Sequence, residues 1–184
     1  MAKKRNVVSV VGLLFISLVA VILLTCEVRI HLRQEKLNFA LFDAIEKSDT
    51  HAVLVLLAEG ANANARHKDK IPSLLNFSEQ TLSGWRKPES TGTALMYATS
   101  GGDLAMVRIL LDNGADVNAR AEYGYTPLLC ATSNFIKGSG SVIRLLVKHG
   151  ADVHTQLNDG TTVWQFATWD PECMKALKQA VDPK

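Results

Sequence analysis

Four apolar runs organise the hydrophobic pattern of this chain of 184 residues. Residues 7–25 hold no charged side chain and consist almost entirely of Leu, Ile, Val and Phe, with one Gly and two Ser. Three shorter apolar runs, at 53–57, 107–111 and 142–147, show helical spacing. The pattern predicts one long apolar helix followed by shorter helices that each bury one face.

The first run is long enough to cross a membrane. At ~1.5 Å per residue, a helix needs ~20 apolar residues to span a bilayer core of ~30 Å. We interpret residues 7–26 as an uncleaved transmembrane signal anchor, because a cleaved signal has a shorter apolar core and a small-residue site behind it. Two alternatives stay open: a cleaved signal, and a lipoprotein box at residues 23–26 with Cys26 as the lipidated residue.

Charges on either side of this segment predict its orientation. Lys3, Lys4 and Arg5 stand together in a basic flank at residues 1–6, whereas the bases after the segment are spread out and mixed with acids. Segments rich in Lys and Arg stay in the cytoplasm. We therefore expect a single-pass membrane protein with a cytoplasmic N-terminus, a juxtamembrane stalk at 27–36, and the rest of the chain in the periplasm or otherwise outside the cytoplasm.

Two short phrases recur in the rest of the chain. One begins with Gly-Ala directly after each shorter apolar run, and the other begins with Thr and ends with Ala. The first phrase stands at 60–66, 114–120 and 150–156, and the second at 93–98, 126–131 and 162–167. Copies of the second phrase begin 33 and 36 residues apart. Recurrence at a few tens of residues indicates a stacked repeat protein.

Both phrases resemble the ankyrin repeat, whose T-P-L-H-x-A helix start is matched at 126–131 and whose G-A-D-V-N-A-R close is matched at 114–120. The resemblance implies an all-α ankyrin-repeat solenoid of helix-turn-helix pairs with β-hairpin-like loops, preceded by one N-terminal transmembrane helix. It predicts a domain at 37–181 with about four repeats and one inserted loop: repeats at 37–66, 88–120, 121–156 and 157–181, and the loop at 67–87. We expect a membrane-anchored ankyrin protein of bacterial origin.

Individual residues suit the helix boundaries that such repeats require. The threonine that opens each second phrase can cap a helix by accepting an unpaired backbone N–H. Pro127 fits a first helical turn, where no N–H is needed. The glycine that opens each first phrase can end a helix in a left-handed conformation. The last helix, near 171–179, is expected to be shortened and to carry polar residues, as suits a terminal cap.

Candidate chemistry is scarce in this sequence. The net charge of +2 is too small to indicate a nucleic-acid partner. Phosphate-loop, zinc-protease and nucleophile-elbow motifs do not occur, and the five histidines show no ligand spacing. We expect no enzyme, no cofactor, no metal site and no small-molecule substrate. Cys130 and Cys173 are interpreted as small buried hydrophobes, with a disulfide between them as the alternative in an exported domain.

The resemblance implies a concave surface, built from hairpin tips and the exposed side of each first helix, that binds a partner protein. Carried to matching positions, this surface comprises Arg120, Glu122, Tyr123, Tyr125, Ser133, Asn134, Gln156, Asn158, Asp159 and Trp169. Tyr123 and Tyr125 carry the most weight, because aromatic residues give large contact area at small entropy cost. The inserted loop either packs back on the stack or offers a second contact through Leu74, Leu75, Phe77 and Trp85.

Taken together, the sequence predicts a membrane-tethered scaffold that gathers a partner protein. Two alternatives come from other functional classes. The chain could be an accessory or chaperone-like factor for exported enzymes, such as oxidative-stress proteins, or a host-directed bacterial effector.

Overall fold

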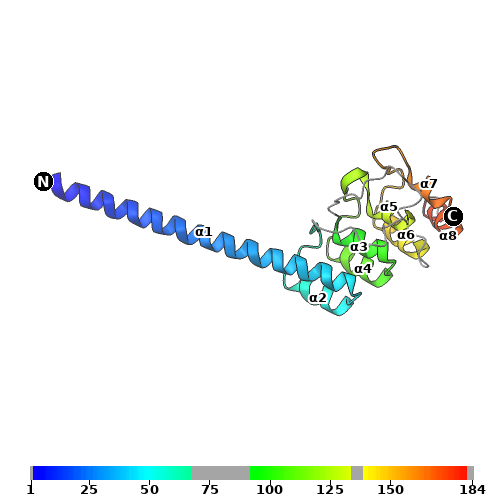
Figure 1. The fold of residues 1–184 in the computed structure, drawn as a ribbon, viewed down its shortest axis with the longest axis horizontal. Coiled ribbons are helices and arrows are strands. Elements are labelled where there is room, and N and C mark those ends of the chain that lie inside the picture. The colour runs from blue at the N-terminus through cyan, green and yellow to red at the C-terminus, as the bar shows by residue number, and fades with distance from the viewer. Residues whose placement is uncertain (1, 68–91, 134–138, 182–184) are drawn as a thin grey trace, which may run out of the picture.

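The computed structural model describes the backbone of residues 2–67, 92–133 and 139–181, and the side chains of these residues from Leu24 onward. The described helices are α1 (Ala2–Glu46), α2 (Thr50–Ala58), α3 (Ala94–Gly101), α4 (Leu104–Asp112), α5 (Pro127–Ser133), α6 (Ser139–Lys148), α7 (Val163–Ala167) and α8 (Pro171–Val181), with a short 3₁₀ turn, η2 (Glu122–Gly124). Figure 1 shows α1 projecting from a stack formed by the other helices. Within the described residues the β pairing is limited to two isolated bridges, Arg66 with Thr93 and Gln156 with Thr162.

Helix α1 runs for 45 residues without a break. The predicted anchor and stalk and the beginning of the first repeat therefore lie on one helix. Among the described residues, no helix is long and apolar enough to cross a membrane. The predicted anchor at 7–26 falls almost entirely on residues whose side chains lie outside the described part, so it stays a prediction.

The helices stack as four successive pairs. Helix α1 packs on α3, α3 on α5 and α5 on α7, which forms one layer, while α2, α4, α6 and α8 follow each other in the second layer. One continuous core lies between the layers. Its largest side chains are fully buried: Leu41, Leu95, Met106, Leu110, Leu128, Leu129, Ile143, Leu146 and Leu177. Burial of such side chains contributes about 1.5–3 kcal/mol each, so the apolar runs drive the stacking.

The predicted helix boundaries are confirmed. The hydroxyl oxygens of Thr93, Thr126 and Thr162 accept the N–H three residues later, at 3.4, 3.3 and 3.3 Å respectively. Pro127 is the first residue of α5. Gly114 follows α4 with a φ of +82°. The N–H of the next residue, Ala115, donates to the Leu110 carbonyl at 3.0 Å. This left-handed glycine ends the helix where a side chain would strain the backbone.

The last helix carries the predicted polar residues but differs from the prediction in length, and the two terminal units differ from each other. The prediction that the last helix is shortened is wrong. Helix α8 spans 11 residues, two more than α4. Its length lets it pack along α6 while Lys175 and Lys178 stay exposed. Helix α2 has no charged residue, and Leu54 on it is 46% exposed. The polar outer face expected of a terminal unit is therefore found on α8 and not on α2.

The cysteines are free thiols. Cys130 and Cys173 are buried, and Cys26 is exposed. The structure thus supports the interpretation of Cys130 and Cys173 as small buried hydrophobes, and no disulfide joins them. Burial raises the pKa of each of these two thiols to about 12, which keeps both protonated at neutral pH.

Candidate protein-binding surface

Hydrogen bonds from one asparagine lock each hairpin to the next. The side-chain amide of Asn118 donates to the Gly150 carbonyl at 2.9 Å, and its oxygen accepts the Asp152 N–H, also at 2.9 Å. Asn64 makes the same two bonds one unit earlier, to the Gly114 carbonyl and the Asp116 N–H. These bonds fix the position of each hairpin relative to its neighbours.

Helix α1 supplies the equivalent bonds for the first hairpin. Gln34 donates to the Gly60 carbonyl at 3.0 Å, and the Asn38 oxygen accepts the Asn62 N–H at 3.0 Å. Since Gln34 lies within the predicted stalk, contact with the repeats begins before residue 37. The end of α1 therefore belongs to the stack.

Two arginines continue this pattern along the outside of the hairpins. The guanidinium of Arg66 donates to the Arg120 carbonyl, and that of Arg120 donates to the Gln156 carbonyl, each at 3.0 Å. All three residues are exposed. Arg120 is thus at the surface as predicted, but its guanidinium also holds two hairpins together. The recurrence of Arg at the end of the first phrase was the sequence signal for this role.

The hairpins of the third and fourth units meet at Tyr123 and Asn158. The Asn158 N–H donates to the Tyr123 carbonyl at 2.9 Å. Tyr123 adopts a left-handed backbone with a φ of +60°, and its side chain is 46% exposed. Gly124 beside it is buried, and a Cβ there would lie 2.9 Å from both Arg120 and Asn158. Such a tight junction presents the Tyr123 ring on a rigid backbone.

Tyr125 and Ser133 are placed differently from Tyr123. Tyr125 is half-buried and packs against the buried side chains of Met96, Ala119 and Cys130, and this burial raises its pKa. Ser133 is buried in α5, where its hydroxyl donates to the Cys130 carbonyl at 3.2 Å. Ser133 therefore offers no exposed side chain for contact.

The tip of the fourth unit's hairpin is shaped by Asp159. Its carboxylate accepts the Thr161 N–H at 2.8 Å, and hydrogen bonds from Thr161 lower the pKa of Asp159. The Leu157 N–H donates to the Thr161 carbonyl at 2.8 Å and closes the hairpin. Asp159 is exposed and charged at neutral pH, so this tip adds a negative group to the surface.

Trp169 lies apart from these hairpins. It follows the C-terminus of α7, at the opposite end of that helix from the hairpin that precedes it, and it is 74% exposed. The remaining predicted contact residues lie outside the described residues: Asn134, Leu74, Leu75, Phe77 and Trp85.

Six predicted residues come together on the two adjoining hairpins of the third and fourth units. We call this the hairpin surface, and it comprises Arg120, Glu122, Tyr123, Gln156, Asn158 and Asp159, all exposed. It combines one aromatic ring, two acids, one base and two amides. Such a mixture suits recognition of a protein, because an aromatic anchor supplies contact area and the polar groups around it supply orientation.

The fold defines a helical repeat protein of the solenoid class. Residues 67–157 match the family model for ankyrin repeats, in three copies. This match supports the resemblance to ankyrin repeats seen in the two phrases. Solenoids of this kind bind proteins along extended surfaces.

Two named relatives share the repeats. A putative ankyrin repeat protein of Rickettsia bellii is 34% identical over 91 residues, which cover 48% of this chain and 38% of the relative. An ankyrin repeat, SAM and basic leucine zipper domain-containing protein 1 of Neofelis nebulosa is 39% identical over 59 residues, 32% of this chain and 12% of the relative. The chain thus spans well under half of either relative, and the similarity concerns the repeats.

Proposed function

We propose that this protein is a membrane-tethered scaffold that binds a partner protein through the hairpin surface. The observation that carries the binding part is the junction of Tyr123 and Asn158. An exposed aromatic ring stands there on a backbone whose carbonyl accepts a hydrogen bond from Asn158 of the neighbouring unit. A ring held in place loses little conformational freedom on binding, so more of its contact energy goes into affinity.

The tether rests on the sequence of the first 26 residues and on α1. A charge-free apolar segment follows Lys3, Lys4 and Arg5, and α1 runs from it directly into the repeats. In the proposed topology the N-terminus lies in the cytoplasm and the repeats lie on the other side of the membrane. Tethering raises the effective concentration of the scaffold for any partner at the same membrane.

The binding part is tested by crosslinking in membranes from the source cells. We expect a crosslinked product of the full chain that is lost on Tyr123→Asn, because Asn tolerates the left-handed backbone but lacks the ring. Glu59→Ala, at the exposed C-terminal end of α2, serves as the control and keeps the product. A product of equal yield in all three proteins contradicts the assignment of binding to the hairpin surface.

The tether is tested by fusing alkaline phosphatase and, in parallel, a cytoplasmic reporter after Lys184. The proposed topology predicts phosphatase activity and a silent cytoplasmic reporter, with the chain in the membrane fraction after a high-salt wash. Activity of the cytoplasmic reporter alone contradicts it. This result is independent of the crosslinking, so the two parts of the proposal stand or fall separately.

A further inference from the structure

A second surface lies on the second layer of the stack, which is formed by α2, α4, α6 and α8. Arg144 and Lys148 on α6 are exposed, as are Lys175 and Lys178 on α8 and Arg108 on α4. Since α4 packs on α6 and α6 on α8, these helices lie side by side. Arg108 and Arg144 occupy equivalent positions, each six residues before the glycine that ends its unit. We call these five residues the basic surface.

Within α6 the cations stand together without compensation. Arg144 and Lys148 are four residues apart, so they lie on one face of the helix, where like charges destabilise it slightly. The described part of the chain places no carboxylate within ion-pair distance of Arg144, Lys148, Lys175 or Lys178. Among the described residues, Arg144 donates only to the Ser141 hydroxyl, at 3.2 Å. The guanidinium and the ammonium groups are thus available to an outside partner.

Helix dipoles explain part of this pattern but not all of it. Lys148 and Lys178 lie in the last turn of their helices, where a cation is favourable. Arg144 and Lys175 lie in earlier turns, where the dipole offers no reason for a cation. Two acids on the same helices, Asp112 and Glu172, reduce the local charge, and five bases against two acids leave it clearly positive.

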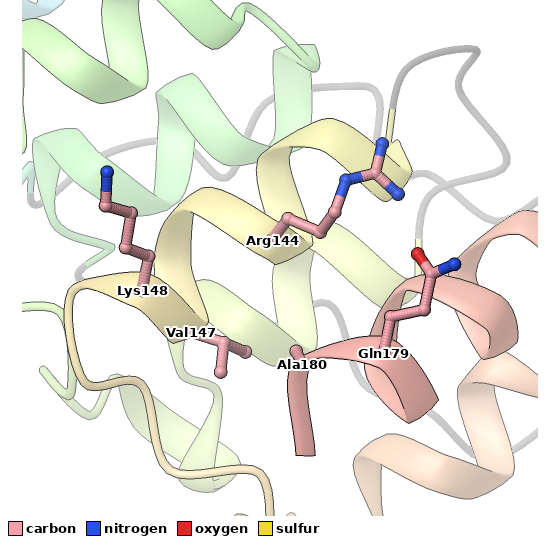
Figure 2. Close-up of a pocket in the computed structure, with 5 residues that line it drawn as sticks. All are labelled: Arg144, Val147, Lys148, Gln179 and Ala180. Carbon is pink, nitrogen blue, oxygen red and sulfur yellow. The ribbon is translucent and has the colours of Figure 1, made fainter. Parts of the chain in front are cut away.

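A shallow pocket of about 210 Å³ lies between α6 and α8 at the centre of this surface. The pocket is lined by Arg144, Val147 and Lys148 of α6 and by Gln179 and Ala180 of α8, and Figure 2 shows Val147 beside Ala180. Val147 and Ala180 give the pocket apolar atoms, and the other three side chains surround it with hydrogen-bond donors. Carboxylates on a chain that also carries small apolar groups match this combination.

We propose that the basic surface binds an extended acidic segment of a protein. Neighbouring helices lie ~8–10 Å apart, and an extended chain in the polyproline II conformation advances ~9 Å in three residues and returns every third side chain to the same face. A segment with a carboxylate at every third residue would therefore meet Arg108, Arg144 and Lys175 in turn. Binding here leaves the hairpin surface free, so the scaffold could hold two protein segments at once.

An anionic bilayer offers the same chemistry as an acidic segment, but the geometry favours the protein. Figure 1 places α8 and the start of α1 at opposite ends of the molecule. A membrane that holds the N-terminal helix would thus lie far from α6 and α8. Exposed charges act mainly within the Debye length, which is ~8 Å at physiological salt.

The proposal is tested on the purified full chain in a zwitterionic detergent. The probe is a fluorescein-labelled peptide of about nine residues, roughly 30 Å when extended, with Glu at every third position. We expect saturable binding by fluorescence anisotropy that weakens as salt is raised. The double variant Arg144→Glu, Lys148→Glu should bind about tenfold more weakly, since two exposed charge contacts are lost.

A matched control reverses the same charge elsewhere. Arg29→Glu with Arg33→Glu changes two exposed arginines that are also four residues apart on a helix, and it should bind like the unmodified chain. Arg144→Gln with Lys148→Gln, checked by circular dichroism, guards against misfolding. Equal losses in both reversed variants, equal binding of a peptide with Gln in place of Glu, or binding to phosphatidylserine vesicles but not to the peptide would each overturn the proposal.

Discussion

The side-chain amide of Asn118 donates to the carbonyl of Gly150 in the next unit, at a distance of 2.9 Å. The same side chain accepts the Asp152 N–H. Gly150 ends α6 and Asp152 opens the following hairpin, so one residue fixes both the helix end and the hairpin of the next unit. His154 occupies the corresponding position in the third copy of the Gly-Ala phrase, and the described chain has no fourth copy after α8 to which it could bond.

Asn118→Ala should therefore destabilise the stack, and His154→Ala should not. Loss of two hydrogen bonds, each leaving a backbone group without its partner, is expected to lower the free energy of unfolding by about 1–3 kcal/mol. His154 is exposed, and its replacement is expected to cost less than about 0.5 kcal/mol. Urea unfolding of both variants measures the difference. Equal stability of the two variants would mean that the asparagine does not couple the units.

Tyr97 predicts a specific loss of stability at alkaline pH. Its hydroxyl is buried and has no hydrogen-bond partner among the residues that the structure describes, and its pKa is raised from 10.0 to about 12 by burial and by the nearby charge of Glu46. The folded state holds this proton more tightly than the unfolded state. The resulting contribution to the free energy of unfolding is therefore complete below pH 10 and is lost as the pH rises from 10 to 12. Unfolding of the unmodified chain across this window should show the decline.

Tyr97→Phe separates this effect from other alkaline titrations. The variant keeps the ring contact with Phe42, whose centroid lies 5.2 Å away. It removes an unpaired hydroxyl, so we expect a gain of about 1 kcal/mol near neutral pH. Between pH 10 and 12 the variant should lose less stability than the unmodified chain. Parallel pH profiles of the two proteins would rule out the assignment to Tyr97.

Thiol reactivity should separate one fast-reacting cysteine from two that are protected by the fold. Cys26 is exposed, whereas the thiols of Cys130 and Cys173 are buried with a pKa of about 12. Only the thiolate attacks Ellman's reagent. In the folded full chain at pH 8 we expect one fast thiol, abolished by Cys26→Ser, and two that react only on unfolding in urea. Three equally fast thiols would contradict the packing of α5 and α8.

Replacing the exposed apolar residue on α2 by lysine should raise solubility without a loss of stability. Leu54 stands where α4 has Arg108 and α6 has Arg144, and it is 46% exposed. Leu54→Lys should change stability by less than about 0.5 kcal/mol and reduce self-association by light scattering. The neighbouring Val53 is fully buried, so Val53→Lys should unfold the first unit. A stability loss for Leu54→Lys similar to that for Val53→Lys would contradict the orientation of α2.

Sequence patterns predicted the parts of the fold that depend on local chemistry. Thr126, Pro127 and Gly114 mark helix boundaries because capping and left-handed turns require particular residue types. The same reasoning could not place Ser133, because its burial depends on how α5 packs against its neighbours. Nor could it show that Gln34 and Asn38 on α1 take the part that Asn64 and Asn118 play later, since different residue types make those bonds.

The candidate surface was predicted only in part for the same reason. Tyr123 and Asp159 follow from the position of the hairpin tips. The partial burial of Tyr125 depends on two side chains of the preceding unit and one of its own unit, and no phrase of the sequence specifies that packing. The basic surface was missed because Arg144 lies within an apolar run and Lys148 directly follows it, and their shared face becomes evident only beside α8.

The most direct test of the proposed function is position-specific photo-crosslinking in the source cells. A photoreactive phenylalanine analogue is placed at Tyr123 in the full chain and, as the control, at Glu59 at the C-terminal end of α2. Our account predicts a discrete adduct of the chain with one protein from position 123 and none from position 59. Adducts of the same size and yield from both positions, or none from position 123, would contradict it.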